Sequence, residues 1–110
     1  MTDELKISEE TGWGEKTGMG VTLFDDYTIE VGSYNNGYYD GKGITVWPNG
    51  DIWIGEIKKD KKNGQGDYIF LNGEWQSGMW KDNKMHGLGL QILPDGNRRY
   101  GEFKEDKFIE

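Results

Sequence analysis

The only histidine in the sequence, His86, is the first side chain to consider for acid–base chemistry, because a positioned imidazole is the commonest general base in enzymes. His86 stands one residue before a glycine, and Asp40 and Asn63 precede their own glycines in the same way. A small polar group that hydrogen-bonds to the local backbone explains all three residues. The spacing therefore favours a structural role for His86.

Carboxylates and glycine-rich motifs give no other sign of catalysis. Asp25 and Asp26 are adjacent, but the sequence shows no apolar pocket that would raise a pKa, so we interpret them as turn residues. The acidic turn at Asp60 is diluted by lysines and lacks the spacing of an EF-hand. The Gly-x-Gly motif at Gly41 has no third glycine and opens no predicted helix, so it does not indicate a phosphate-binding loop.

Cysteine is absent from the 110 residues, which excludes disulfides, thiolate zinc sites and cysteine nucleophiles. A chain of this length is expected to form one domain and buries too little surface to wall a large catalytic cleft. We therefore predict no catalytic residue, no cofactor and no metal site. A binding or structural module is expected rather than an enzyme.

The Gly-x-Gly motif is informative as a repeat, because it recurs every 23 residues in four copies. Its first glycines are Gly18, Gly41, Gly64 and Gly87. We expect a leader or cap at 1–17 and a repeat domain at 18–110. The predicted units are 18–40, 41–63, 64–86 and 87–109.

Each unit is predicted to be a β-hairpin. A third glycine follows 14 residues after the first, and three units carry Asn-Gly or Asp-Gly before it, as at Asn49-Gly50. These dipeptides tolerate the positive φ of a tight hairpin turn, and no segment shows the 3.6-residue apolar period of a helix. We assign a structural role to the repeated glycines, which are Gly18, Gly20, Gly32, Gly41, Gly43, Gly55, Gly64, Gly66, Gly78, Gly87, Gly89 and Gly101.

Apolar residues recur at the same positions of successive repeats, in columns that flank each predicted turn and point to both faces of the sheet. If the turn has two residues, Val46 lies opposite Trp53, and adjacent columns alternate between the two sides. A single sheet of about eight strands cannot cover both faces with its own loops. One row is therefore expected to form the core while the other stays partly exposed, as interaction surfaces do.

These columns, together with the polar run from Lys81 to His86, resemble MORN repeats. The resemblance covers about 92 of the 110 residues and is closest from Gly64 to Phe108, whereas the first unit departs from the pattern at its turn. It implies an all-β fold, an elongated, twisted antiparallel sheet of successive β-hairpins. It also implies scaffolding, dimerisation or partner binding, and lipid binding has been proposed for the family.

Aromatic residues are the expected partner-binding side chains. The segment from Tyr34 to Tyr39 combines Tyr, Asn and Gly, which supply rigid amphipathic area and adaptable hydrogen bonding in protein-binding surfaces. Tryptophans in the apolar columns extend this surface. The predicted partner-binding residues are Tyr34, Tyr38, Tyr39, Trp47, Trp53, Trp75 and Trp80.

Charge is unevenly distributed along the chain. The net charge is −7, and the acidic excess lies in 1–57. Such a chain should avoid nucleic-acid backbones and, at long range, anionic lipids, although the basic cluster at 58–62 leaves a membrane headgroup as a weaker candidate partner. No stretch is long and apolar enough to cross a bilayer, and the first residues are too polar for a signal peptide, so we expect a cytoplasmic protein.

Three functions remain open from the sequence. The first is a scaffold or adaptor that binds another protein through an aromatic-rich sheet face and the acidic N-terminal half. The second is an acidic inhibitor that blocks a nucleic-acid-binding enzyme, as phage counter-defence proteins do, and the third is a phospholipid-recognition module. End-to-end homodimers could form by edge pairing through 2–17 or 104–110.

Overall fold

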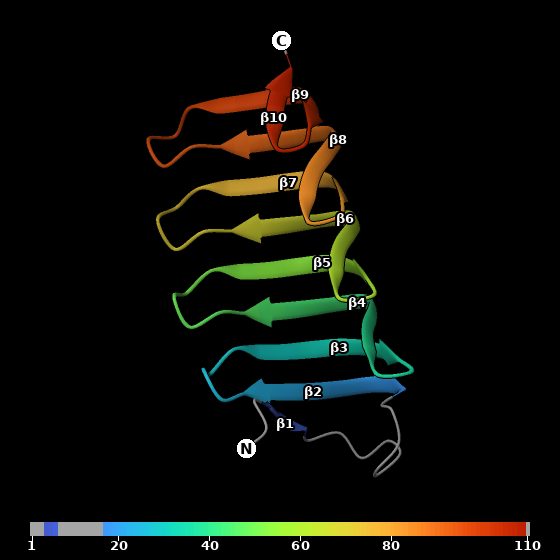
Figure 1. Ribbon diagram of the computed structural model, residues 1–110. Helices are drawn as coiled ribbons and strands as arrows, with labels where there is room; N and C mark the ends of the chain where they lie inside the picture. Colours follow the sequence, from blue (N-terminus) through green and yellow to red (C-terminus); the bar gives the residue numbers. More distant parts are fainter. Residues whose placement is uncertain (1–3, 7–16, 110) are drawn as a thin grey trace.

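The repeated hairpins pair with one another in a single open sheet (Figure 1). The computed structural model describes residues 4–6 and 17–109, and side chains from Thr17 onward. The strands are β1 Glu4–Lys6, β2 Gly18–Phe24, β3 Ile29–Asn35, β4 Tyr38–Val46, β5 Ile52–Lys58, β6 Lys61–Ile69, β7 Trp75–Lys81, β8 Lys84–Ile92, β9 Arg98–Lys104 and β10 Lys107–Ile109. They are antiparallel and follow sequence order, so the predicted all-β fold is confirmed.

The sheet is elongated, with extents of 49 × 23 × 19 Å. Of the predicted leader at 1–17, the structure describes only β1, which pairs with β2, and Thr17; the rest lies outside the described residues. The division into a leader and four units stays a prediction.

The two-residue turns do not lie at the predicted Asn-Gly and Asp-Gly positions. Lys59 and Asp60 join β5 to β6 with φ of 46° and 70°, and equivalent pairs join β3 to β4, β7 to β8 and β9 to β10. The predicted turn at Asn49-Gly50 instead belongs to a wider loop, in which the Trp47 N–H donates to the Asp51 carbonyl over 3.0 Å. The alternation of wide loops and tight turns makes the chain a continuous meander.

The wider loop corrects the predicted strand register. Val46 pairs with Ile52 rather than with Trp53, and Trp53 pairs with Thr45. The sequence predicted a different register because Asn-Gly usually marks a two-residue turn. Here Gly50 has a positive φ, of 97°, within a wider loop. Side chains still alternate between the two faces.

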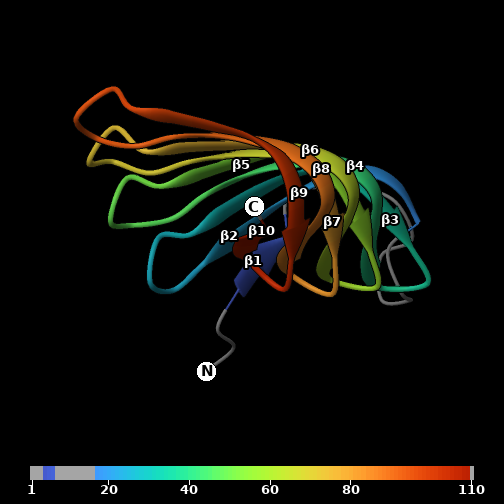
Figure 2. The ribbon, with the colours of Figure 1, turned by 90° about the horizontal axis from the view of Figure 1, so that it is seen from above.

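Paired glycines let the sheet bend sharply. Gly55 lies opposite Gly66, and a Cβ on Gly55 would overlap the Gly66 backbone and lie 2.7 Å from the Gln65 carbonyl oxygen. Equivalent pairs recur along the sheet at Gly32 with Gly43 and at Gly78 with Gly89. The strands curve at this level, so the sheet has a concave side, as Figure 2 shows.

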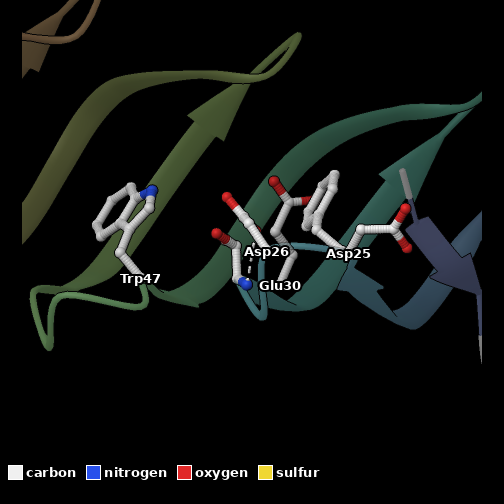
Figure 3. Close-up of a pocket in the computed structure, with 6 residues that line it drawn as sticks. Asp25, Asp26, Glu30 and Trp47 are labelled. Carbon is white, nitrogen blue, oxygen red and sulfur yellow. Dashed lines mark hydrogen bonds between the residues drawn. The ribbon is translucent and has the colours of Figure 1, made fainter. Parts of the chain in front are cut away.

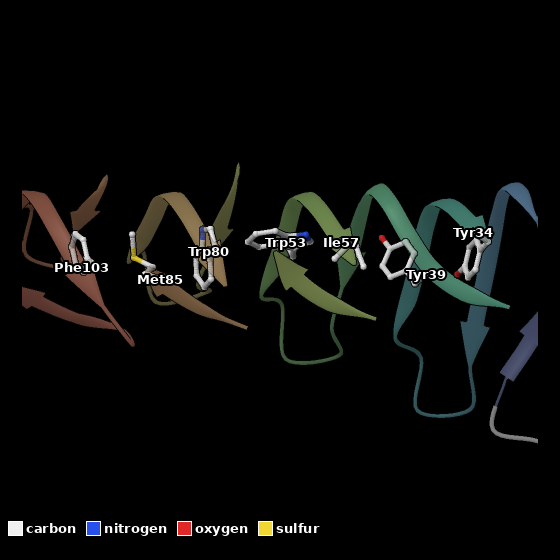
Figure 4. Packing of buried hydrophobic residues seen from close by; sticks show 7 residues of the cluster. All are labelled: Tyr34, Tyr39, Trp53, Ile57, Trp80, Met85 and Phe103. Carbon is white, nitrogen blue, oxygen red and sulfur yellow. The ribbon is translucent and has the colours of Figure 1, made fainter. Parts of the chain in front are cut away.

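The concave side holds the core (Figure 4). Its members form a row that crosses the stack of strands, and they are Tyr34, Tyr39, Trp53, Ile57, Trp80, Met85 and Phe103. Rings and chains from this row lie over the glycines: Tyr39 covers Gly43, and Met85 covers Gly89. The structural role predicted for these glycines follows, because a methyl group would occupy the space of the core side chain.

The tight turns at Asp60, Asn83 and Asp106 are each tied to the preceding unit. The Asp60 N–H donates to the Tyr39 carbonyl over 2.8 Å, and the Tyr39 N–H donates to Asp60 Oδ1 over 2.9 Å. Met85 and Asp106 repeat both bonds. Successive units are thus joined by side-chain bridges as well as by the strand ladder.

The first loop has the same shape as the others despite its different sequence. Tyr27 has φ of 75° where the other loops have glycine, as at Gly50 with φ of 97° and Gly96 with φ of 93°. A bulky residue in the left-handed region is strained. The side chain of Tyr27 is 76% exposed, so packing does not compensate for this strain.

We predict that Tyr27→Gly raises the free energy of unfolding by about 1 kcal/mol, because it relieves the left-handed strain. Urea denaturation followed by tryptophan fluorescence measures the change. The reciprocal variant Gly96→Ala should lower stability by a similar amount, since a Cβ there meets nothing within 4 Å and only the backbone strain changes. A Tyr27→Gly variant less stable than the parent would contradict the strain at this position.

Candidate functional site

The structure places four of the predicted partner-binding residues in the core. Tyr34, Tyr39, Trp53 and Trp80 are buried, and Trp53 has no exposed surface. The prediction that they contact a partner is therefore corrected: they stabilise the concave side. The sequence could not make this distinction, because both faces of the sheet carry large apolar residues.

The other three predicted residues are accessible but do not form one surface. Tyr38 starts β4, where Lys59 Nζ lies 5.8 Å from its ring centre. Trp75 lies on the convex side, and its indole N–H donates to Asp67 Oδ2 over 3.0 Å. Trp47 lies in a wide loop and packs against the edge of the core. The structure therefore does not assemble the aromatic-rich face expected from the sequence.

Trp47 is held by a cluster of rings around one lysine. Its ring stacks on Tyr68 with centres 5.2 Å apart and planes 25° apart. Lys62 Nζ lies 5.7 Å from the centre of the Trp47 ring, 5.9 Å from Trp53 and 5.5 Å from Tyr68. Burial lowers the pKa of Lys62. This lysine therefore faces inward, and the predicted basic cluster at 58–62 presents one fewer charge to a membrane.

Asp51 fixes the loop that carries Trp47. Its Oδ2 accepts from the Tyr68 hydroxyl over 2.9 Å, and its Oδ1 accepts from the Leu71 N–H of the next wide loop over 3.0 Å. Burial alone would raise the pKa of Asp51, but the hydrogen bonds from Leu71, Tyr68 and Asn49 hold it below its usual value. Two neighbouring loops are thus joined by one ionised carboxylate.

A cleft of about 550 Å³ opens beside Trp47 (Figure 3). It lies between the first two wide loops, and its lining residues are Phe24, Asp25, Asp26, Thr28, Glu30 and Trp47. In Figure 3, Trp47 stands on one side of the opening, with Asp26 and Glu30 toward the middle and Asp25 beyond them. Among the residues that the structure describes, the lining combines two aromatic rings with three carboxylates and contains no basic side chain.

Hydrogen bonds position two of these carboxylates. Asp26 Oδ1 accepts from the Thr28 N–H over 2.9 Å, and the bonds from Thr28 lower the pKa of Asp26. Glu30 Oε1 accepts from the Tyr34 hydroxyl over 2.9 Å, and that hydroxyl also lies 2.7 Å from Thr22 Oγ1. An aromatic wall facing ionised carboxylates suits a cation, above all a planar guanidinium.

Sequence reasoning missed this cleft because it treated Asp25 and Asp26 as turn residues only. Asp26 does close the turn, in the way that Asp95 does through its bond to the Asn97 N–H. The signal that could have revealed the site was the departure of the first unit from the repeat, combined with the acidic N-terminal half. The position of Trp47 across the cleft required the strand pairing.

No metal centre is evident in the residues that the structure describes, since no three His, Cys, Asp or Glu side chains are grouped to hold an ion. His86 is half-buried on β8. Within the same described ranges, no helix of a length and apolarity sufficient to span a bilayer is found.

A family model described as MORN repeat matches three consecutive stretches, residues 31–52, 53–75 and 77–98. Together they span more than half of the 110 residues. None of the curated proteins matches the chain.

We predict that Asp51→Asn lowers the free energy of unfolding by about 1 kcal/mol at pH 7, because a neutral amide replaces a charged hydrogen-bond acceptor. The folded pKa is lowered, so this stabilisation is present above the ordinary value of 3.8 and is lost as the pH falls through the folded value. Urea denaturation at pH 7 and at a series of lower pH values should show the difference from the parent shrinking. A difference that stays constant or grows in acid would contradict the assignment.

Proposed function

The chain belongs to the MORN repeat family, and we propose that it binds a partner protein and has no catalytic activity of its own. The family is a non-catalytic repeat module, and its members are generally protein or membrane interaction modules. The observation that carries this proposal is the cleft beside Trp47. It has a volume of about 550 Å³, aromatic walls and three carboxylates. A basic side chain of the partner, arginine in preference to lysine, enters it.

The chemistry of the cleft favours arginine for two reasons. A guanidinium stacks on an aromatic face such as that of Trp47 while its N–H groups reach carboxylates in its own plane. Trp47 is already fixed by its stack on Tyr68, so little side-chain freedom is lost on binding.

Two further features support a binding role at this end of the sheet. The acidic excess of 1–57 attracts basic partners at long range. Tyr27 keeps a strained, exposed conformation in the loop that also carries Asp25 and Asp26. Backbone strain that packing does not require is often retained for binding.

The inhibitor hypothesis is a special case of the same recognition. An arginine or lysine that lines a nucleic-acid channel would enter the cleft, and binding would then compete with nucleic acid and weaken with salt. Lipid binding has less support. Lys62 packs among the aromatic rings, so only Lys58, Lys59 and Lys61 of the basic cluster are exposed to a membrane. The cytoplasmic location and end-to-end dimers expected from the sequence stay predictions.

We predict that a short peptide with a central arginine shifts the NMR signal of the Trp47 indole N–H, and that the same peptide with glutamine does not. Asp26→Asn should weaken this binding roughly two- to fivefold, the effect of losing one partly screened charge. The amide should keep the turn intact, because Asn49 and Asn72 accept the same loop hydrogen bond in their units.

Asp95→Asn is the matched control, since Asp95 holds the equivalent place in the last wide loop, away from the cleft. It should leave the affinity unchanged. Trp47→Ala, followed through the backbone N–H signal of Asp26 because the variant lacks the indole, should abolish peptide binding. No arginine-dependent shift in the parent protein, or equal weakening by the two Asp→Asn variants, would reject the cleft as the binding site.

A further inference from the structure

The first tight turn, Asn36-Gly37, lacks the bridge that the other three tight turns make within the described part of the chain. In those turns the second residue donates its N–H to a carbonyl of the preceding unit, and its side chain accepts an N–H there. These second residues are Asp60, Asn83 and Asp106. Gly37 has no side chain to accept such a bond. Among the described residues, its N–H has no acceptor either.

An Asn-Gly pair can react with itself, because the glycine nitrogen can attack the side-chain amide of the asparagine. No Cβ on the glycine hinders this approach. The attack requires that the glycine N–H and the asparagine side chain are both free to move, so hydrogen bonds at either group slow it. The sequence contains four such pairs, which begin at Asn36, Asn49, Asn63 and Asn72.

The two pairs in the wide loops are held at both reacting groups. Asn49 Oδ1 accepts from the Asp51 N–H over 3.0 Å. The Gly50 N–H donates to the Trp47 carbonyl over 2.9 Å. The pair at Asn72 makes the same two bonds in the next wide loop. Reaction at either pair therefore requires local opening of its loop.

The other two pairs differ in the same respect. The pair at Asn63 lies within β6, where Gly64 is paired with Trp80 of β7. Asn36 and Gly37 are instead both exposed. Within the described ranges, the only hydrogen bond of Asn36 is from its backbone N–H to Thr17 Oγ1, over 3.1 Å, and its side chain has no partner. Both reacting groups are thus free at this turn.

We propose that Asn36 is a site of spontaneous deamidation, for which water is the only co-reactant. The Gly37 nitrogen loses its proton to solvent and bonds to Cγ of Asn36, the Cγ–Nδ2 bond breaks, and the leaving nitrogen takes up a proton and departs as ammonia. Water then opens the resulting succinimide ring. Opening at Cγ gives an aspartyl residue at position 36, and opening at the main-chain carbonyl gives an isoaspartyl residue.

The isoaspartyl product changes the hairpin that β3 and β4 form. Its main chain runs through Cβ and Cγ, which lengthens a two-residue turn with φ of 50° at Asn36 and 85° at Gly37. The two strands hold Tyr34 and Tyr39, whose ring centres are 5.2 Å apart in the core. A lengthened turn loosens this end of the core. The chemistry itself does not depend on the cleft or its ligand.

Incubation of the full chain at neutral and mildly alkaline pH, followed by peptide mass spectrometry, tests the proposal. Asn36 should show the mass gain of an amide-to-acid conversion roughly tenfold faster than Asn49 or Asn72, because the wide loops must first open. The rate should rise with pH, since the attacking nitrogen must lose its proton. In urea, where the fold is lost, the four Asn-Gly pairs should react at similar rates.

Two variants serve as matched controls, because other tight turns carry the same residues. Gly37→Asp copies Asp60, which has φ of 70° at the same place, and should slow the reaction at Asn36 severalfold by hindering the attack. Asn36→Lys copies Lys59, which has φ of 46°, and should remove the reaction from this turn.

Three results would overturn the proposal. In the first, Asn36 of the folded protein reacts no faster than Asn49. In the second, Asn36 reacts in urea alone, which would mean that the folded turn prevents the attack. In the third, Asn36 is favoured by the same ratio in urea as in the folded protein, which would mean that hydrogen bonds of the fold do not select the site.

Discussion

The close approach of backbones at paired glycines is the constraint on which the rest of the structure depends. At Gly55 and Gly66 the strands come so near that a methyl group would overlap the opposite backbone. The sheet bends there, and side chains on its concave side, such as Tyr39, lie over the glycines. One layer of chain thereby encloses a core that usually requires two layers. The same bend leaves the convex face of the sheet without a core of its own.

The second unit shows how this constraint tolerates variation. Its core column has Lys62 where neighbouring units have Tyr39 and Met85. A lysine ammonium does not cover a glycine in an apolar core, and the ring of Trp53 lies over Gly66 instead. The ammonium turns toward the rings of Trp47, Trp53 and Tyr68. The lysine at this repeat position therefore determines how Trp47, which lines the cleft, is packed.

The candidate site arises where the repeat is least regular. The first wide loop keeps the backbone shape of the others, with Tyr27 in the glycine position, but carries two adjacent aspartates. The loop beside it contributes Trp47, which Asp51 and Tyr68 hold in place. Regular hairpins provide the scaffold, and an irregular loop provides the chemistry. Binding residues often lie on loops positioned by a rigid framework in this way.

The sequence by itself determined the 23-residue period, the β-hairpin unit and the glycine rows, because turn chemistry and strand propensity are local properties. Only the tertiary structure decided which apolar column is buried. Trp53 and Ile54 are neighbours with similar character, yet the first has no exposed surface and the second is nearly half exposed. The bend at the glycines selects the face that closes, and strand pairing brings Trp47 to Glu30. Both depend on contacts between residues distant in sequence, which local patterns do not encode.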